Sequence, residues 1–431
     1  MLALEFIRKN PDLVRRAAEL KGEPAPVDEI LRLDAVWREH LHTAEKIKEE
    51  QNKLSKEFAK TRDEALKERL RQMADTAKSE LSVAGAVKRE LDDLLLRVPN
   101  VFHESVPVGE TGADNVVARE WGDKPDLGFA ARTHFDLGEA LGVMDFERAA
   151  RVSGARFAFL IGEGARLERA LVQFMLDVHT REHGYTEVWP PILVNSASMV
   201  GTANLPKFAD AAFKVEGSDL WLIPTAEVPV TNLHREEILD GDRLPLKYVA
   251  YAPSFRTEAG AAGKDTRGFI RLHQFSKVEL VKVTSAETSL DEFEKLTRDA
   301  EDILQRLGLH YRVMSMCTGD MGFAQYKKYD LEAWAPGLDR YLEVSSCSVF
   351  NDFQAMRANI RYRPERGAPP RFAHTINGSG LALPRTIDAI METYQRSDGM
   401  INVPDVLRPY LGGVELIGAG PPPFRAPPGG L

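Results

Sequence analysis

One long stretch with a heptad pattern constrains the fold of this chain more than any other feature. Residues 27–97 contain no proline and only one glycine, Gly85. Apolar residues recur at heptad spacing in two runs, each with a second apolar row beside it: Ile30, Trp37, Ala44 and Phe58 with Leu33, Ile47 and Leu54, then Leu70, Ala77, Ala84, Leu91 and Val98 with Met73, Val87 and Leu94. Two such rows form the seam of a coiled coil. We therefore expect two helices, each about 50 Å long, that fold back near Thr61-Arg62-Asp63 as an antiparallel hairpin.

The expected turn of this hairpin is locally basic. Near it, positive side chains outnumber negative ones: Lys53, Lys56, Lys60, Arg62, Lys67, Arg69 and Arg71 against Glu57, Asp63, Glu64 and Glu68. A basic tip on a protein with a net charge of −9 suits nucleic-acid phosphates. The solvated surface of a coiled coil also carries many charges, and the residues alone favour that interpretation.

Length and composition bound the class of protein. A chain of 431 residues suggests roughly two to three domains, and 43% hydrophobic with 28% charged residues is typical of soluble globular proteins. Cys317 and Cys347 have no His or Cys neighbours at metal-ligand spacing, which predicts a reduced intracellular protein without a disulfide framework or a cysteine zinc site. The sequence MLALEFIRKNPDLVRR predicts neither a signal peptide nor a membrane span.

The rest of the chain predicts a second, mixed domain. Helices are expected at Gly164–His183, at Ser289–Leu307 and after Thr386, and strands at residues 310–316 and Tyr341–Ser348. Pro190 and Pro191 interrupt strand pairing, so their segment belongs at an edge, an interface or a bend. Hairpins and irregular connections outnumber regular βα units, which predicts an α+β fold with a largely antiparallel sheet and flanking helices.

The stretch Tyr251–Leu280 reads as two strands joined by a glycine-bearing loop. The first strand is expected to carry Arg256 and Glu258, and the loop covers residues 259–268. Strict alternation in the second strand places on one face Arg271, His273, Phe275, Lys277 and Glu279, opposite Leu272, Val278 and Leu280. Such a face suits a ligand that is anionic, planar and cationic at once, as ATP with an amino acid is. The solvated face of an ordinary hairpin is the alternative.

Five sequence signatures follow one another along the chain. They are GYTEVWPP after an amphipathic helix, PTAE at 224–227, FRTE with a loop and HQFSKVEL, EVSS at 343–346, and NGSGLALPRTIDAIME. The first, third and fifth resemble motifs 1, 2 and 3 of class II aminoacyl-tRNA synthetases. The other two, with the helical hairpin, resemble the seryl-tRNA synthetases of that class. The resemblance covers nearly the whole chain. It is to the bacterial form, because the divergent archaeal form uses a zinc site and this chain has no cysteine set at zinc-ligand spacing.

This resemblance implies a domain plan and an activity. A tRNA-binding domain would cover residues 1–103, with an antiparallel two-helix coiled-coil arm at 27–98. A class II catalytic domain, built on a mainly antiparallel β-sheet flanked by helices, would cover 104–417, with motif 1 near 164–194, motif 2 near 249–281 and motif 3 near 375–396. The Pro/Gly-rich residues 418–431 are expected to be disordered. The implied activity is ATP-dependent formation of seryl-adenylate and transfer of serine to tRNA(Ser), and also to tRNA(Sec), by a cytoplasmic homodimer without membrane contact.

The resemblance also assigns the ATP site. The catalytic residues would be Arg256, Arg385 and Glu343, because charge develops on phosphate oxygens and fixed cations stabilise it. Phe275 and Arg385 would stack on the two faces of adenine, Glu258 would accept from its amino group, and Arg271 would contact a phosphate. The ATP-binding set is Arg256, Thr257, Glu258, Arg271, Leu272, Phe275, Glu343, Val344, Ser345, Ser346 and Arg385.

Serine and a metal ion receive their own residues. The serine-binding set is Thr225, Ala226, Glu227, Glu279, Ser379 and Asn377, with Glu279 as the partner of the hydroxyl and ammonium groups. Mg²⁺, bound together with ATP, would be held by Glu343 and Ser346, and no zinc is expected. Strict alternation pairs Glu343 with Ser345 rather than Ser346. The strand therefore either bulges or ends near Val344.

The arm and the motif 2 loop would bind tRNA. The candidate tRNA-binding residues are Lys53, Lys56, Lys60 and Arg62 at the tip, with Lys264 and Arg267 in the loop. With the resemblance in hand, the nucleic-acid interpretation of the tip is favoured, through RNA shape and backbone rather than base sequence. Deleting residues 35–95 is then expected to leave serine-dependent pyrophosphate exchange largely intact and to abolish charging.

Several alternatives stay open at this point. A paralogue of the same fold that loads carrier proteins would lack the long hairpin. A non-catalytic regulatory paralogue would lack Arg256, Glu279, Glu343 or Arg385, all of which are present. A paralogue for antibiotic self-resistance is not distinguished by these residues. Cys347 is interpreted as a small buried apolar residue, and His273 either contacts ATP or is a hydrogen-bonded structural histidine.

Overall fold

The computed structural model of the chain describes residues 1–259 and 268–420. It divides into two compact units, Met1–Val101 and Phe102–Leu431. No helix in the described ranges combines the length and apolar character needed to cross a membrane.

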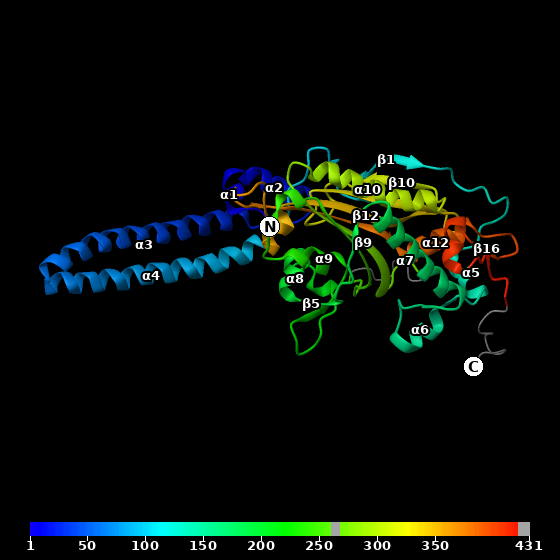
Figure 1. The fold of residues 1–431 in the computed structure, drawn as a ribbon, viewed down its shortest axis with the longest axis horizontal. Coiled ribbons are helices and arrows are strands. Elements are labelled where there is room, and N and C mark those ends of the chain that lie inside the picture. The colour runs from blue at the N-terminus through cyan, green and yellow to red at the C-terminus, as the bar shows by residue number, and fades with distance from the viewer. Residues whose placement is uncertain (260–267, 421–431) are drawn as a thin grey trace. The chain divides into compact units, whose positions relative to one another are not determined.

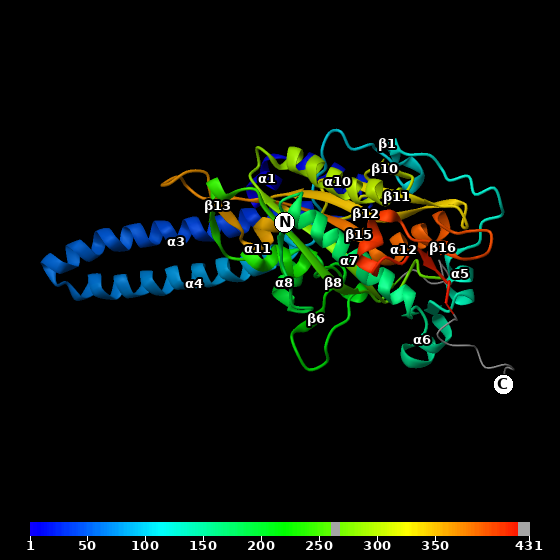
Figure 2. The same ribbon diagram turned by 45° about the vertical axis from the view of Figure 1, so that its right-hand side comes forward.

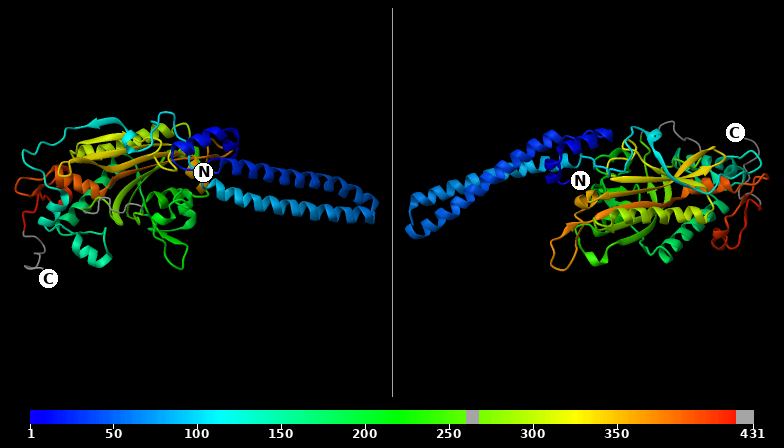
Figure 3. Two further views of the ribbon diagram at one scale, coloured as in Figure 1. Left: turned by 180° about the vertical axis from the view of Figure 1, so that it is seen from behind. Right: turned by 90° about the horizontal axis from the view of Figure 1, so that it is seen from above.

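The first unit contains the expected helical hairpin. Its helices are α1 (Leu4–Lys9), α2 (Pro11–Leu20), α3 (Val27–Thr61) and α4 (Glu64–Leu95). The two long helices run side by side along their length (Figures 1 and 3). Arg62 ends α3 in the left-handed conformation, with a φ of 52°, and Asp63 starts α4 by accepting from the Ala65 N–H at 2.9 Å. The predicted turn is thus confirmed.

Burial within the hairpin falls from its base to its tip. Ile30, Leu33, Ala77, Leu91 and Leu95 are buried, whereas seam residues nearer the tip, such as Leu54 and Phe58, are only half-buried. Polar contacts also join the two helices: His40 Nδ1 to Glu80 Oε2 at 2.6 Å, Gln51 Nε2 to the Leu70 carbonyl at 3.3 Å and Arg69 Nη2 to Glu50 Oε1 at 2.9 Å. Two helices alone cannot cover both sides of the seam, so the tip half keeps a solvent-exposed surface.

The second unit is built on an eight-stranded sheet in the order β1-β10-β11-β12-β15-β9-β8-β4. The strands are β1 (Val116–Trp121), β10 (Tyr311–Ser315), β11 (Lys327–Ala335), β12 (Arg340–Asn351), β15 (His374–Ala382), β9 (Gln274–Thr284), β8 (Leu246–Phe255) and β4 (Thr186–Glu187). All neighbours are antiparallel except β4 and β8. The α+β prediction with a mainly antiparallel sheet is confirmed.

Helices and short strands surround this sheet. The helices are α5 (His134–Ala140), α6 (Phe146–Ser153), α7 (Glu163–Arg181), α8 (Ser196–Gly201), α9 (Glu227–Thr231), α10 (Ser289–Arg306), α11 (Phe353–Ala358) and α12 (Leu383–Thr393). The smaller strands pair as β2 (Met144–Asp145) with β3 (Phe159–Leu160), β5 (Leu193–Asn195) with β6 (Leu220–Leu222), β16 (Ile401–Asn402) with β17 (Leu416–Ile417), and β7 (Ile238–Asp240) with β13 (Arg361–Arg363) and β14 (Arg371–Phe372).

Alternation along β9 separates two faces of the sheet. Val278 and Leu280 are fully buried in one large apolar core with residues of α7, α10 and α12. Helices α10 and α12 pack beside β12 and β15 (Figure 2), and α7 packs against β8. Lys277 and Glu279 point the other way and line or border a cavity. Cys347 belongs to the apolar core, as predicted, and burial raises the pKa of its thiol to about 12.

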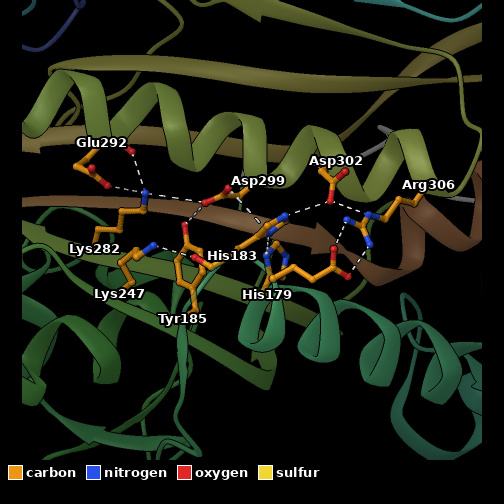
Figure 4. A network of polar contacts seen from close by, with 10 residues as sticks. His179, His183, Tyr185, Lys247, Lys282, Glu292, Asp299, Asp302 and Arg306 are labelled. Carbon is orange, nitrogen blue, oxygen red and sulfur yellow. Dashed lines mark hydrogen bonds and ion pairs between the residues drawn. The ribbon is translucent and has the colours of Figure 1, made fainter.

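A polar network joins α7 to α10 on the core side of the sheet (Figure 4). Lys282 Nζ donates to Glu292 Oε2 at 2.9 Å, Tyr185 OH donates to Asp299 at 2.7 Å, and His183 Nε2 lies 3.1 Å from an Asp302 carboxylate oxygen. Burial lowers the pKa of Lys282, although Glu292 and Asp299 oppose this. Removing one partner would leave a buried charge unpaired, which is strongly destabilising. The network therefore holds α10 against β9.

The two strands of the stretch 251–280 are shorter than predicted. β8 ends at Phe255 and β9 begins at Gln274, so the prediction that Arg256, Glu258, Arg271 and His273 lie on strands is wrong. The Arg256 N–H still donates to the His273 carbonyl at 3.0 Å. Beyond it, Glu258 adopts a left-handed φ of 52° and turns the chain out of the sheet.

The proline pair follows the sheet edge. β4 is one of the two edge strands of the large sheet, and Pro190 and Pro191 come shortly after its end, which agrees with the edge interpretation. Trp189 beside them is 91% exposed. Most of the Pro/Gly-rich tail, residues 421–431, lies outside the described residues.

Candidate active site

A cavity of about 370 Å³ lies over the polar face of the sheet. It brings together most of the predicted site residues from segments far apart in the sequence: Thr225, Glu227, Arg256, Glu258, Arg271, Leu272, Phe275, Glu343, Val344, Ser345, Ser346, Asn377, Ser379 and Arg385. Glu279 contacts this set through Thr225. The side chains divide into a carboxylate group and an arginine group.

Glu279 is the centre of the carboxylate group. Its side chain is 1% exposed, and its Oε2 accepts from Thr225 Oγ1 at 2.6 Å and forms an ion pair with Lys277. Ser379 on β15 lies directly opposite Glu279 on β9. Oε1 of Glu279 is buried and has no hydrogen-bond partner within residues 1–259 and 268–420. A buried acceptor of this kind is costly unless a ligand donor reaches it.

Glu227 adds a second carboxylate. Its Oε1 accepts from Gln354 Nε2 at 2.6 Å and its Oε2 accepts from Asn377 Nδ2 at 2.8 Å. Burial, reinforced by the nearby charge of Glu279, raises the pKa of Glu227 to about 7. Two carboxylates held this close favour a bound cation, because a positive charge relieves their repulsion.

Arginines form the other group. Arg256 Nε donates to the Pro224 carbonyl at 3.2 Å, and its Cζ lies 5.1 Å from the centroid of the Phe275 ring. Arg271 Nη1 donates to Glu258 Oε2 at 3.2 Å. Arg256 therefore reaches the residue before Thr225 and stands next to the carboxylate group. Arginines in this arrangement can bind phosphate and carboxylate oxygens in a bidentate way.

Arg385, near the start of α12, joins that helix to β12. Its Nη1 donates to the Glu343 carbonyl at 2.8 Å and lies 3.4 Å from the Glu343 carboxylate, and its Nε donates to the Ile270 carbonyl at 3.2 Å. Burial raises the pKa of Glu343, but the positive charges of Arg385, Lys328 and Arg256 outweigh burial and lower it. Glu343 is therefore ionised at neutral pH and available to a cation.

A bulge in β12 brings Glu343 and Ser346 into the same cavity. Glu343 pairs with Glu332 and Ser345 with Leu331, so Val344 has no partner on β11. The first of the two explanations left open by the sequence is thus the one observed. Carboxylate and hydroxyl oxygens suit Mg²⁺. The described residues contain no group of three or more His, Cys, Asp or Glu side chains arranged to hold a metal ion.

A buried charged pair supports this part of the cavity. Asp330 on β11 lies opposite Ser346, and Lys328 Nζ is 3.0 Å from Asp330 Oδ2. Burial raises the pKa of Asp330 to about 7, with Glu343 adding to the shift and Lys328 opposing it. Lys328 of this pair supplies a positive charge that lowers the pKa of Glu343.

A few predicted residues lie elsewhere. Thr257 Oγ1 donates to the Asp210 carbonyl at 2.6 Å, and Ala226 is buried in a separate apolar cluster, so neither side chain lines the cavity. His273 Nδ1 bonds the Arg256 carbonyl at 2.9 Å, which supports its structural interpretation. Lys264 and Arg267 lie outside the described residues. Lys53, Lys56, Lys60 and Arg62 lie near the turn of the α3–α4 hairpin.

Three residues that complete the site received no role from the sequence, although Lys277 was placed on the ligand-facing side of its strand. Lys277 and Lys328 line the cavity, and Gln354 on α11 holds Glu227. Alternation along β9 places Lys277 on the Glu279 face, so its signal was available. Lys328 and Gln354 meet the site only through long-range packing, and no local pattern marks them.

Comparisons with known proteins agree on one family. The profile described as "Seryl-tRNA synthetase N-terminal domain" matches residues 1–102, and that described as "tRNA synthetase class II core domain (G, H, P, S and T)" matches residues 212–394. The serine–tRNA ligase of Caldanaerobacter subterraneus subsp. tengcongensis is 54% identical over 416 residues, which cover 95% of this chain and 98% of the relative.

Two solved structures are similar over nearly the whole chain. Seryl-tRNA synthetase from Pyrococcus horikoshii, complexed with ATP, has a TM-score of 0.92 and 41% identity, covering 97% of this chain and 99% of that one. Cytoplasmic serine–tRNA ligase from Naegleria fowleri, in complex with AMP, has a TM-score of 0.87 and 33% identity, covering 97% and 98% of the two chains.

Proposed function

We propose how this chain, which belongs to the seryl-tRNA synthetase family of class II aminoacyl-tRNA synthetases, carries out serine–tRNA ligation. As an ATP-dependent ligase it first forms seryl-adenylate with release of pyrophosphate and then transfers the seryl group to tRNA. One observation carries the assignment of residues: a single cavity holds a carboxylate group around Glu279 and an arginine group around Arg256. Serine presents an ammonium and a hydroxyl to the first, and ATP presents phosphates to the second.

The carboxylate group binds serine. Glu279 Oε1, which has no partner among the described residues, accepts from serine, while Oε2 stays with Thr225 and Lys277. Glu227, held by Gln354 and Asn377, supplies the second negative charge for the ammonium. Alanine and glycine have no hydroxyl group to donate to Glu279 Oε1. Their binding would leave this buried acceptor unpaired, which lowers their affinity by more than the loss of one weak contact would.

The arginines stabilise the α-phosphate while the adenylyl group is transferred to serine. Arg256 reaches the carbonyl of Pro224 beside the serine residues, which supports a role for its guanidinium between the serine carboxylate and the α-phosphate. When that carboxylate attacks, charge grows on the α-phosphate oxygens, and a fixed cation is worth more there than in water. Arg385 and Arg271 contact the remaining phosphates. In the structure the Glu343 carbonyl orients Arg385, and the Glu258 carboxylate orients Arg271.

Glu343 and Ser346 are suited to hold Mg²⁺. Both line the cavity, and the charges of Arg385 and Lys328 keep Glu343 ionised. When bound, the ion would neutralise charge on the phosphate oxygens. Phe275 stacks on one face of adenine and the flat face of the Arg385 guanidinium on the other, while the N–H edge of Arg385 is left for a phosphate; Glu258 accepts from the adenine amino group. Thr257 supports this end through its bond to the Asp210 carbonyl.

The helical arm binds tRNA(Ser), and tRNA(Sec) is the second expected acceptor. Of the four tip residues, Lys53 already pairs with Glu49 at 2.8 Å. Within the described part of the chain, Lys56, Lys60 and Arg62 form no side-chain ion pair, so their charges are available for RNA phosphates. Lys264 and Arg267 would meet the acceptor end. We expect the protein to act in translation in the cytoplasm.

A homodimer completes the proposal. The apolar side chain of Trp189 is 91% exposed just beyond edge strand β4, where motif 1 lies. A large exposed ring at a sheet edge is more stable when another surface covers it. Sedimentation of the purified protein tests this, and Trp189→Asp would be expected to shift a dimer toward monomers.

Pyrophosphate exchange with single amino acids tests the central assignment. We expect exchange with serine and at least 100-fold less with alanine or glycine, since these leave the buried Glu279 acceptor unpaired. Charging of tRNA(Ser) should follow with the same preparation. Exchange with alanine or glycine but not with serine would overturn the serine site, and exchange without charging would separate the cavity assignment from the arm assignment.

A further inference from the structure

A fully buried histidine lies outside the proposed ligand contacts. His134 begins α5, and its side chain is 0% exposed. Its Nδ1 lies 2.8 Å from Glu392 Oε1, and its main-chain N–H donates to the same oxygen at 2.9 Å. The other oxygen of Glu392 accepts from the N–H groups of Gly337 and Leu338, at 2.8 and 3.1 Å. Both Glu392 oxygens thus act as acceptors of main-chain N–H groups, which assigns the proton of the third contact to Nδ1 of His134 as the donor.

The second ring nitrogen of His134 faces the motif 2 segment. The Phe269 N–H donates to Nε2 of His134 at 3.3 Å. An amide N–H can only donate, which requires an unprotonated Nε2 and therefore the neutral ring with its proton on Nδ1. Asp388 Oδ2 is 3.6 Å from Nε2, beyond hydrogen-bond distance. Burial raises the pKa of Asp388 to about 7, despite the opposing charge of His134. A carboxyl group with this pKa attracts a proton on Nε2 less strongly than a fully ionised one.

The chain approaches His134 closely at this point. Gly268 has a φ of +83°, and a Cβ added there would lie 2.5 Å from Nε2 of His134. The next residues are held in turn: Phe269 by His134, the Ile270 carbonyl by Arg385 Nε at 3.2 Å, and Arg271 by Glu258 at 3.2 Å. The main chain is thus fixed at Phe269 and Ile270, just before Arg271, whose side chain is held by Glu258.

Helix α12 reaches this segment by two routes. Arg385 contacts it directly, and Glu392, two turns further along α12, contacts it through His134. We propose that His134 is a positioning residue for adenylate formation, because it places the Gly268–Arg271 main chain at the ATP end of the cavity. His134 touches no substrate atom in this proposal, which rests on the function proposed above.

Two substitutions separate the two ring nitrogens. In His134→Asn the side-chain amide can still donate to Glu392 but does not extend to Phe269. In His134→Gln the longer side chain places an amide oxygen where Nε2 stood, so the acceptor for Phe269 is kept. A neutral hydrogen bond contributes about 1 kcal/mol, so its loss is expected to raise the KM for ATP about five-fold in His134→Asn. The KM for serine should stay within two-fold, and His134→Gln should restore the KM for ATP.

A matched control accounts for general loss of stability. His310 is also buried, bonds the Trp121 carbonyl at 3.0 Å and Tyr341 OH at 2.8 Å, and does not line the cavity. His310→Asn is expected to lower the thermal midpoint without changing the KM for ATP. Equal KM values for ATP in His134→Asn and His134→Gln, or a change in His134→Asn that His310→Asn reproduces, would overturn the positioning role.

The pH profile gives a second readout that does not need His134→Asn to fold. Burial lowers the pKa of His134, but Asp388 and Glu392 on α12 outweigh it, and Arg340 opposes them, so the pKa is raised. Protonation turns Nε2 into a donor. The KM for ATP of the unmodified enzyme should therefore rise toward acid pH relative to that of His134→Gln, whose amide does not titrate. A constant ratio between the two would contradict the proposal. Inactivity of the unmodified enzyme with serine would instead contradict the function on which it rests.

Discussion

Arg385 Nη1 donates to the Glu343 carbonyl at 2.8 Å and lies 3.4 Å from the carboxylate of the same residue. One guanidinium thus fixes the main chain of β12 beside its bulge and keeps the Glu343 side chain ionised. A lysine in its place would keep a charge but lose the planar fork that allows both contacts together with the bond to Ile270.

Replacing Arg385 should therefore impair the chemical step. We expect Arg385→Lys to lower kcat for serine-dependent pyrophosphate exchange about 100-fold, within the range seen when a transition-state donor is removed. The KM for serine should change little, since serine lies at the carboxylate group. Arg396→Lys is the matched control, because Arg396 pairs with Asp398 at 3.0 Å on the surface. An equal loss in both variants would contradict this role.

Glu279→Gln tests the serine site. The substitution keeps the shape of the side chain but removes the charge that Thr225 and Lys277 contact and that serine would complete. A hydrogen bond to a charged group contributes about 1.5 to 3 kcal/mol, so the KM for serine should rise about 10- to 100-fold. The KM for ATP should stay within about three-fold of its original value. A larger effect on ATP than on serine would assign Glu279 to the other end of the cavity.

The raised pKa of Glu227 predicts a pH-dependent affinity for serine. Its carboxyl titrates at about 7, and only the ionised form attracts the ammonium group. Below that pH serine must displace a proton, so its KM should rise about ten-fold between pH 8 and pH 6. Glu227→Gln should bind serine more weakly and lose this dependence. An unchanged pH profile in Glu227→Gln would show that another group titrates.

The same shift has a consequence for stability. Folding raises the pKa of Glu227 from its usual 4.5 to about 7, so the folded state holds a proton that the unfolded chain has lost. The contribution of this group to stability is therefore present below pH 4.5 and is lost as the pH rises toward 7. Thermal midpoints of the ligand-free protein and of Glu227→Gln should diverge across this interval.

Local sequence patterns predicted the elements that depend on local physics. The heptad seam predicted α3 and α4. The motifs predicted that Arg256, Glu343 and Arg385 would meet in one cavity, with Glu279 joined to it through Thr225. Alternation failed where the chain leaves ideal geometry: after Phe255, where β8 ends and Glu258 then adopts a left-handed φ, and at Val344, whose bulge brings Ser346 into the cavity. Neither irregularity has a local signal, because each depends on the register of a neighbouring strand.

Supporting residues were harder to predict than the residues they support. Gln354 and His134 lie on short helices remote in sequence from Glu227 and Phe269, and they meet them only through packing. A single polar residue on a helix has many possible partners. Burial and hydrogen-bond geometry identified these two, which no motif did.

The arm provides the last prediction, and the structure sharpens its design. Removing residues 35–95 would also remove Leu91 and Leu95, which are buried at the base of the hairpin and stabilise the first unit. Deleting residues 42–78 keeps both leucines and retains the His40–Glu80 contact. A linker of about four residues can join the two helices there, because packed helices lie about 8–10 Å apart.

For this deletion variant, pyrophosphate exchange should stay within two-fold, because no cavity residue lies in the arm. Charging of tRNA(Ser) should fall by more than 100-fold, since the phosphate contacts of Lys56, Lys60 and Arg62 are lost. Full-length Lys56→Glu/Lys60→Glu should give a smaller, salt-dependent rise in the KM for tRNA, and efficient charging by the deletion variant would show that the arm does not bind the tRNA.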